Sequence, residues 1–418
     1  MPKLIVKNFS VIKDAELEFG KLTVLIGPQS SGKSLLCKLR FFLLDALSIA
    51  TRAIGDQETL KAFRADLKKK FIAEFPENTW GSEKFQISYT HNHYEVSLRQ
   101  VGTSDPEEGS LQVSLSGEFE ELYQSTLQAV RSILQKRKSE DQAEVSEAFF
   151  EALDVASHSL RSLLGEGERE IQLFIPAGRA FFTNYSKSFT AIQSRRTDPF
   201  TGRFGQLMAR AFDRHPRITG GNRKELPTFD SNTFELLKGR LERGEGLVMF
   251  KTEDGRTLSL SQLSSGTQEV LPLVLALRPL TGSVLSRTVY VEEPEAHLFP
   301  TAQYELVKLF SWLSNIGPEL TRWVFTTHSP YILSSFNNLI LAGQLGENET
   351  LRREIPIKQE YWIKRGAFAA YCIHDGILRP ILSESGLIDG EYLDSVSETI
   401  GNEFDSLLKL ENEHIDAT

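Results

Sequence analysis

The chain is poor in the residue types that mark several protein classes. It has 418 residues but only two cysteines, Cys37 and Cys372, too few for a disulfide framework or a zinc cluster. Its longest apolar stretch near the middle, residues 270–277, contains a proline and is far shorter than the ~20 residues that span a bilayer. Residues 1–10 contain no apolar segment of the kind that directs export. These absences favour a globular, cytoplasmic protein without a membrane partner.

The formal charge of −9 is unevenly distributed along the chain. Residues 381–418 contain ten acidic side chains and a single base, Lys409, whereas residues 179–224 contain ten basic side chains against Asp198 and Asp213. A basic segment of this kind is typical of a nucleic-acid or partner surface, and a solvated loop and helix face is equally compatible. We expect the basic segment to bind DNA or RNA in a salt-sensitive manner and the acidic tail to dock a partner or a second copy.

The apolar pattern predicts an α/β protein. Alternating or continuous apolar residues predict strands, at residues 3–9, 15–19, 22–26, 85–89, 94–98, 111–115, 171–175, 247–250, 257–260, 288–291 and 323–326. Apolar runs and spacings of three or four predict helices, at residues 34–50, 119–138, 143–164, 267–277 and 302–313. The acidic tail is predicted to form an amphipathic helix with apolar residues at Leu393, Val396, Ile400, Phe404 and Leu407.

A phosphate-binding motif follows the third predicted strand. Residues 27–34 match the pattern G-x-x-x-x-G-K-[ST] and open a helix, so backbone N–H groups and the helix N-terminus would face phosphate oxygens. Lys33 would bridge the β- and γ-phosphates of ATP, and the Ser34 hydroxyl would ligate Mg²⁺. The predicted nucleotide-binding residues are Gly27, Pro28, Gln29, Ser30, Ser31, Gly32, Lys33 and Ser34.

A second motif places two carboxylates at the end of an apolar strand. Residues 288–291 lead directly into Glu292 and Glu293, the arrangement of a Walker B motif. One carboxylate of such a pair holds Mg²⁺ and the next polarises the attacking water. We assign Glu292 to the metal and Glu293 to the catalytic base.

Two weaker motifs accompany these residues: residues 263–268, Leu-Ser-Ser-Gly-Thr-Gln, precede a predicted helix, and residues 323–330 are a strand that runs into His328. Together, the four motifs resemble the SMC/RecF/OLD-like branch of ABC-type ATPases. The most specific piece is residues 292–300, Glu-Glu-Pro-Glu-Ala-His-Leu-Phe-Pro. The resemblance implies that Ser264 and Gly266 bind the γ-phosphate of ATP held by a second subunit. It also implies that His328 contacts the γ-phosphate and that residues 296–298 form the D-loop.

The resemblance further implies an ABC-type P-loop ATPase head, a mixed sheet with flanking helices, plus a helical and loop lobe that carries the signature motif. For the Q-loop glutamine of this family, Gln172 is the candidate. The expected divisions are an ATPase lobe with a short helical insert, a basic lobe, the remaining ATPase core and the acidic tail, at residues 1–175 (insert about 117–165), 176–262, 263–375 and 376–418.

The implied function is an ATP- and Mg²⁺-dependent ATPase that forms a homodimer or higher homo-oligomer. Many relatives in this branch serve in bacterial anti-phage defence, which predicts a sensor or switch that controls a separate nuclease or toxin effector. Two alternatives remain open from the sequence: a RecF-like DNA repair ATPase, and a nucleotide-gated scaffold with negligible turnover.

Overall fold

The computed structural model describes residues 1–102, 110–136, 142–169, 171–185, 198–213, 224–244 and 247–389. The amphipathic helix expected around residues 393–407 lies outside this part of the chain, as do residues 186–197 and 214–223 of the basic segment. Within the described ranges, no helix combines the length and the apolar character needed to cross a bilayer. The division of the chain at residues 175, 262 and 375 stays a prediction.

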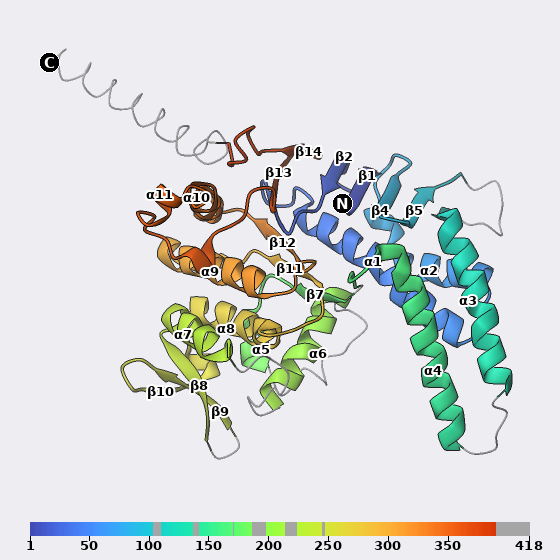
Figure 1. Ribbon diagram of the computed structural model, residues 1–418, viewed down its shortest axis with the longest axis horizontal. Helices are drawn as coiled ribbons and strands as arrows, with labels where there is room; N and C mark the ends of the chain where they lie inside the picture. The colour runs from blue at the N-terminus through green and yellow to red at the C-terminus, as the bar shows by residue number, and fades with distance from the viewer. Residues whose placement is uncertain are drawn as a thin grey trace, which may run out of the picture.

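One mixed sheet of eleven strands organises the molecule, in the order β6-β5-β4-β1-β2-β14-β13-β3-β12-β11-β7 (Figure 1). The five strands from β13 to β7 are mutually parallel, whereas the strands from β6 to β2 form antiparallel pairs. The bounds are β1 Lys3–Phe9, β2 Ile12–Glu18, β3 Leu22–Ile26, β4 Gln86–His91, β5 Tyr94–Gln100, β6 Leu111–Leu115, β7 Gln172–Ile175, β11 Thr288–Glu292, β12 Arg322–Thr327, β13 Phe368–His374 and β14 Ile377–Pro380.

Helices cover this sheet, and a three-stranded sheet lies beside it. Helices α1–α4 gather at one end of the molecule, and α7–α9 lie with the smaller sheet at the other (Figure 1). The helices are α1 Lys33–Gly55, α2 Leu60–Glu74, α3 Gly117–Lys136, α4 Gln142–Arg161, α5 Ala180–Tyr185, α6 Pro199–Asp213, α7 Leu226–Leu237, α8 Ser265–Leu277, α9 Pro300–Ile316, α10 Pro330–Leu345 and α11 Glu349–Arg352. The smaller sheet contains β8 Gly239–Gly244, β9 Leu247–Thr252 and β10 Thr257–Ser259.

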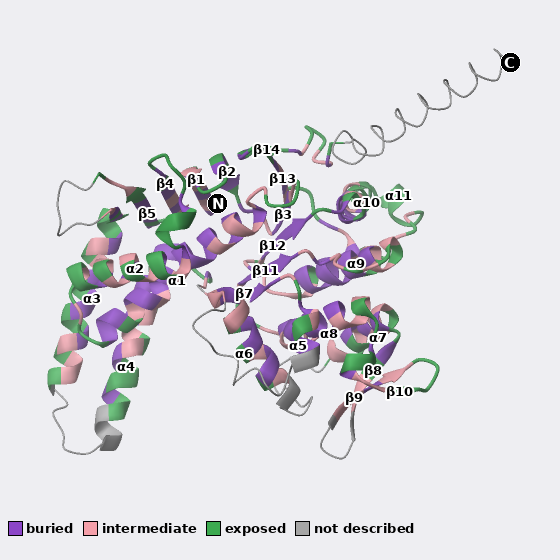
Figure 2. Ribbon diagram, turned by 180° about the vertical axis from the view of Figure 1, so that it is seen from behind, coloured by how far each residue is buried: buried purple, intermediate pink, exposed green. Residues whose placement is uncertain are grey.

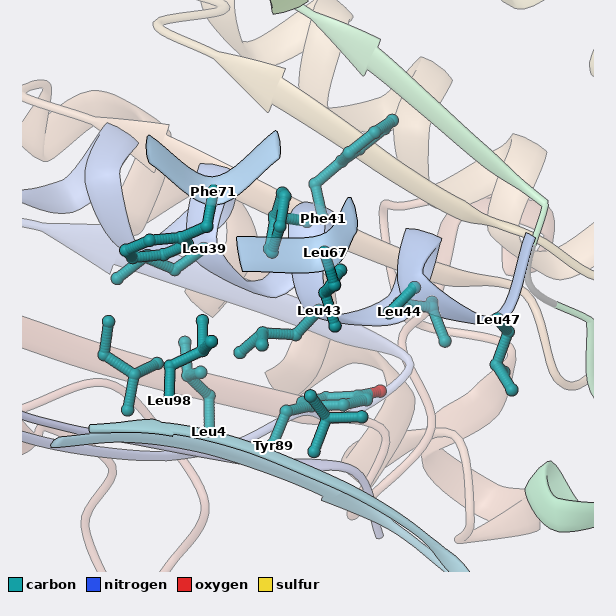
Figure 3. Close-up of a cluster of buried hydrophobic side chains, with 14 of the residues drawn as sticks. Leu4, Leu39, Phe41, Leu43, Leu44, Leu47, Leu67, Phe71, Tyr89 and Leu98 are labelled. Atoms are coloured by element: carbon teal, nitrogen blue, oxygen red, sulfur yellow. The ribbon is translucent and has the colours of Figure 1, made fainter. Parts of the chain in front are cut away.

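The central strands separate two apolar cores because consecutive residues of a strand face opposite sides of the sheet. In β11, Tyr290 packs with α1–α4, whereas Val289 and Val291 pack with α8–α10. All five residues of β11 are buried, and so are most residues of α1, α8 and α9 (Figure 2). Figure 3 shows leucines and aromatics of α1 and α2 lying over strand residues such as Leu4 and Tyr89. This double burial explains why the strand sequences are continuous apolar runs.

The structure confirms each predicted strand and helix that lies within the described residues, with ends displaced by a few positions. It adds elements to which the sequence analysis gave no bounds, namely α2, α5, α6, α7, α10, α11, β8, β13 and β14. The most consequential addition is β13, which pairs in parallel with β3 and therefore lies next to the phosphate-binding loop.

A buried carboxylate at the end of α2 generates a prediction for stability. Glu74 has a 13% exposed side chain and an ion pair with Arg203 of α6 at 3.3 Å. Burial raises the pKa of Glu74 to about 7, against the lowering effect of Arg203. A raised folded-state pKa means that protonation favours the folded state. The resulting stabilisation is present below about pH 4.5 and is lost as the pH rises through about 7.

We therefore expect the free energy of unfolding of the wild type to fall between pH 5 and pH 8 relative to that of Glu74→Gln, by at most about 3 kcal/mol. Urea denaturation over this pH range measures the difference. Glu95→Gln, at an exposed position of β5, serves as the matched control and should follow the wild type. Parallel profiles for the wild type and Glu74→Gln would contradict the prediction.

Candidate functional site

Three neighbouring parallel strands bring the sequence motifs to one edge of the large sheet. In the register of β3, β12 and β11, Ile26 lies beside Thr327, and Thr326 lies beside Glu292. The phosphate-binding loop follows β3, Glu293 follows β11 and His328 follows β12. Parallel strands end on the same side, so the three motifs converge although they are far apart in the chain.

The two glycines that bound the phosphate-binding loop are required by close packing. A Cβ at Gly27 would lie 2.3 Å from the carbonyl oxygen of Ile373 in β13. Gly32 caps α1 with φ of +104°, and a Cβ there would lie 2.9 Å from Ile12 of β2. Any other residue at either position would displace the loop from the strands beneath it. Between the glycines, the exposed crest of the loop consists of Pro28, Gln29 and Ser30, followed by the half-buried Ser31.

Lys33 lies across the mouth of this loop. Its ammonium donates to the carbonyl oxygens of Gly27 and Pro28, both at 2.8 Å, and lies 3.4 Å from Nδ1 of His328. Burial lowers the pKa of Lys33, and the negative charge of Glu293 opposes that shift. Two carbonyl oxygens of the loop therefore hold the ammonium, within hydrogen-bonding reach of His328.

His328 connects Lys33 to Glu293. Its Nε2 lies 3.0 Å from Oε1 of Glu293, and its Nδ1 faces Lys33. An ammonium can only donate, so Nδ1 accepts and Nε2 carries the proton that is donated to Glu293. Glu293 itself has a φ of +42°, an uncommon conformation for a non-glycine residue, and its backbone N–H donates to the carbonyl oxygen of Thr326 at 2.9 Å.

Glu295 is a functional candidate that the sequence analysis quoted without assigning a role. Its Oε1 accepts from the Thr327 hydroxyl and from the backbone N–H of His328, both at 2.7 Å. Its Oε2 is buried without a hydrogen-bond partner among the described residues. The carboxylate therefore fixes the start of the loop that carries His328. In the sequence, the third glutamate of Glu-Glu-Pro-Glu was the feature that could have identified Glu295 as a candidate.

Glu292 and Ser34 fit a magnesium ion. The Glu292 side chain is almost fully buried, and its Oε2 accepts from the N–H of Ala177 at 3.3 Å. Its Oε1 is buried with no partner in the described part of the chain. Burial raises the pKa of Glu292, and a hydrogen bond from the Ser34 side chain opposes this. The described residues contain no cluster of three or more metal-ligating side chains, so nucleotide oxygens and water would complete the coordination.

The signature residues lie on a different surface from the phosphate-binding loop. Ser264 caps α8 by accepting from the N–H of Thr267 at 3.2 Å, and a Cβ at Gly266 would lie 2.8 Å from the carbonyl oxygen of His297. With Leu298, these residues line a shallow pocket of about 420 Å³, to which residues 27–34 of the same subunit contribute nothing. The N-terminus of α8 therefore packs against residues 297 and 298, within the segment expected to form the D-loop.

Two residues singled out in the sequence have structural roles instead. Gln172 accepts from the Tyr290 hydroxyl at 2.8 Å and donates to the carbonyl oxygen of Phe41, so its side chain is held in the α1 core and cannot serve as the Q-loop glutamine. Arg179, counted in the basic segment, is fully buried and cannot contact nucleic acid. Of the other described bases in this segment, Arg203 forms ion pairs with Asp45 and Glu74.

The chain matches a protein-family model over residues 22–334. The family is described as "AAA domain, putative AbiEii toxin, Type IV TA system". The chain belongs to this family. Membership confirms the expected ABC-type P-loop ATPase head, with its mixed sheet and flanking helices, and the ATP-binding class. A search of curated proteins finds no significant match.

Solved structures of SMC heads are among the similar proteins. The SMC head domain from Thermotoga maritima has 14% identity and a TM-score of 0.38, over 91% of this chain and 98% of that chain. An Smc head with an extended coiled coil, bound to the C-terminal domain of ScpA derived from Pyrococcus furiosus, has 12% identity and a TM-score of 0.37, over 96% and 100%.

Replacing Lys33 with methionine tests the loop geometry. The variant keeps the length of the side chain but removes the charge-assisted hydrogen bonds to phosphate, each worth roughly 1.5–3 kcal/mol. We expect ATP affinity to fall about 10- to 100-fold, measured with a fluorescent ATP analogue. Lys61→Met, at an exposed position of α2, is the control and should bind as the wild type does. Equal ATP affinity of the Lys33→Met and Lys61→Met variants would contradict the assignment of Lys33 to the nucleotide-binding site.

Proposed function

We propose that this protein hydrolyses ATP at a Mg²⁺-dependent site formed by residues 27–34, Glu292, Glu293 and His328. The observation that carries the proposal is the continuous line of contacts from Lys33 through His328 to Glu293. This line places a cation, a neutral imidazole and a carboxylate at the mouth of one phosphate-binding loop.

Each side chain has a separate task in this proposal. When ATP binds, the Lys33 ammonium gives up its hydrogen bonds to the loop carbonyl oxygens and donates to phosphate oxygens instead. Glu293 orients the attacking water and accepts its proton, and the Nε2–H of His328 holds the Glu293 carboxylate in place. Ser34 and the free Oε1 of Glu292 hold Mg²⁺. When bound, the metal supplies charge neutralisation at the phosphates.

Glu293→Gln tests the assignment of the base. The amide keeps the size of the side chain but cannot accept a proton, and general-base contributions are typically 10²- to 10⁴-fold. We expect the ATP turnover number to fall by at least about 100-fold while ATP binding is retained. Phosphate release and analogue binding measure the two quantities. Glu95→Gln should leave both unchanged, and undiminished hydrolysis by Glu293→Gln would refute the assignment.

We propose further that Ser264 and Gly266 act on ATP held by a second copy of this chain. The support is their position: they lie at the exposed N-terminus of α8, a helix end that favours anions, and they line a pocket without residues 27–34 of their own subunit. A two-fold dimer would place each α8 N-terminus opposite the phosphate-binding loop of the other subunit, giving two composite sites.

A mixing experiment tests this composite site. Lys33→Met removes the loop contribution and Ser264→Arg blocks the signature, so each homodimer should be inactive. A heterodimer of the two variants contains one composite site with both parts intact. Random mixing should restore ATP turnover to about a quarter of the wild-type value in a two-fold symmetric dimer. A mixture as inactive as its components would contradict action between subunits. Wild-type activity of the Ser264→Arg homodimer would show that Ser264 takes no part in ATP hydrolysis.

For the biological role, we propose that ATP binding and hydrolysis switch a separate toxin or nuclease effector in bacterial defence. The support is the family description, which names a toxin and a toxin–antitoxin system. Co-purification with the products of neighbouring genes, with and without ATP, tests the role. An ATP-dependent complex with an effector is expected, and an assembly with DNA repair proteins would favour the RecF-like alternative.

A further inference from the structure

Arg179 is a fully buried arginine that holds the end of the Walker B strand. It follows β7 and immediately precedes α5. Its Nη1 donates to the carbonyl oxygen of Glu292 at 2.6 Å and to that of Pro176 at 3.1 Å, and its Nη2 donates to the carbonyl oxygen of Glu293 at 3.0 Å. The guanidinium thereby fixes the peptide units of both Walker B acids, including the residue with positive φ.

The same arginine is tied to the signature helix through Glu269. Its Nε donates to the carbonyl oxygen of Glu269 at 3.1 Å. In return, the Glu269 carboxylate accepts from the backbone N–H groups of Arg179 at 2.9 Å and Ala180 at 3.1 Å. Both side chains are buried. Glu269 lies one helical turn beyond Ser265, the first residue of α8, and α5 packs beside α8 (Figures 1 and 2).

The carboxylate of Glu292 is attached to this same connection. The N–H of Ala177, two residues before Arg179, donates to Oε2 of Glu292. The segment between β7 and α5 therefore contacts both the carboxylate of Glu292, through Ala177, and the backbone carbonyl of Glu292, through Arg179. A shift of α8 would therefore change these contacts, because Glu269 ties α8 to Arg179 and the close-packed interior leaves the buried guanidinium no free space to absorb the displacement.

Electrostatic interactions also favour the intact Arg179–Glu269 pair. Besides Glu269, the acids that act favourably on the charge of Arg179 are Glu295, Glu292 and Glu293. Arg179 is thus the buried cation beneath the acids of the site. Losing one partner of a buried ion pair leaves an uncompensated charge, which is far more costly than losing an exposed pair.

We propose that Arg179 and Glu269 are a positioning pair that couples the N-terminus of α8 to Glu292 and Glu293 of the same subunit. This inference rests on the proposed function. When Ser264 and Gly266 engage the phosphate of the partner's nucleotide, the displacement of α8 passes through Glu269 and Arg179 to the Walker B peptide units. The hydrolytic site of one subunit then responds to the nucleotide that its signature contacts in the other.

Kinetics of Arg179→Lys, Glu269→Gln and the double variant test the pair in the full-length protein. Lysine keeps the charge but not the fork of donors, and glutamine keeps the shape of glutamate but not its charge. We expect each single change to lower kcat at least about 10-fold, with ATP affinity changed less than about 3-fold and with a reduced Hill coefficient for ATP. The double variant should lose no more than the worse single variant, because groups that act as a unit are not additive.

Arg322→Lys is the matched control. Arg322 forms a bidentate pair with Glu168, both bonds at 2.7 Å, at the opposite end of β12 from His328. This variant disrupts a partly buried arginine–glutamate pair of the same sheet away from the site, so kcat and the Hill coefficient should stay at the wild-type values. Circular dichroism and thermal melting identify variants that do not fold. Glu269→Asp, which keeps the negative charge but withdraws the carboxylate from the N–H groups of Arg179 and Ala180, is measured in the same way if Arg179→Lys or Glu269→Gln is unfolded.

The outcomes separate the two levels of the proposal. A wild type that binds but does not hydrolyse ATP overturns the proposed function and the inference with it. A wild type with normal turnover, accompanied by a folded Glu269→Gln variant with unchanged kcat and Hill coefficient, overturns the inference alone. So does an effect on ATP affinity without an effect on kcat, or losses that multiply in the double variant.

Discussion

The parallel register of β3, β12 and β11 is the constraint on which the rest of the site depends. Hydrogen bonding between these strands sets the relative positions of their ends, and each end leads into one group: the phosphate-binding loop, His328, or the carboxylates of Glu292 and Glu293. Two apolar cores bury both faces of the strands, so a slip of one residue would turn the apolar side chains of β11 to the wrong face and move Glu292 away from Ser34. The geometry of the candidate site is therefore a consequence of sheet packing.

The local parts of this arrangement could be predicted from the sequence, because a strand, a tight turn and a helix start follow one another in residues 22–34. The same holds for the apolar strand that ends in Glu292. Helix α2 could also have been found, since Phe63, Leu67 and Phe71 recur every four residues and are buried. What could not be predicted is which distant segment lies beside each motif, because no local pattern specifies a strand's neighbour. β13 illustrates this: its pairing with β3 makes glycine necessary at position 27.

Residues that position the site were missed for the same reason. The contacts of Arg179 join residues 90 to 114 positions apart, and nothing in its neighbourhood distinguishes a buried arginine from a basic surface. Gln172 was the candidate for the Q-loop glutamine, yet Tyr290, on the neighbouring strand β11, satisfies its side chain. In both cases the decisive information is the burial of a polar group, which becomes visible only after folding.

Burial also changes what the charge of the basic segment means. The sequence gives residues 179–224 an excess of eight positive charges, but a charge count treats every guanidinium as if it faced water. Arg179 balances carboxylates inside the protein, and Arg203 lies between Asp45 and Glu74 while its guanidinium stacks over Phe41. Both cations are partners of acids in the folded head. The positive charge available to attract nucleic acid is therefore smaller than the charge count of the sequence suggests, because these two arginines help to hold α5 and α6 against the ATPase core.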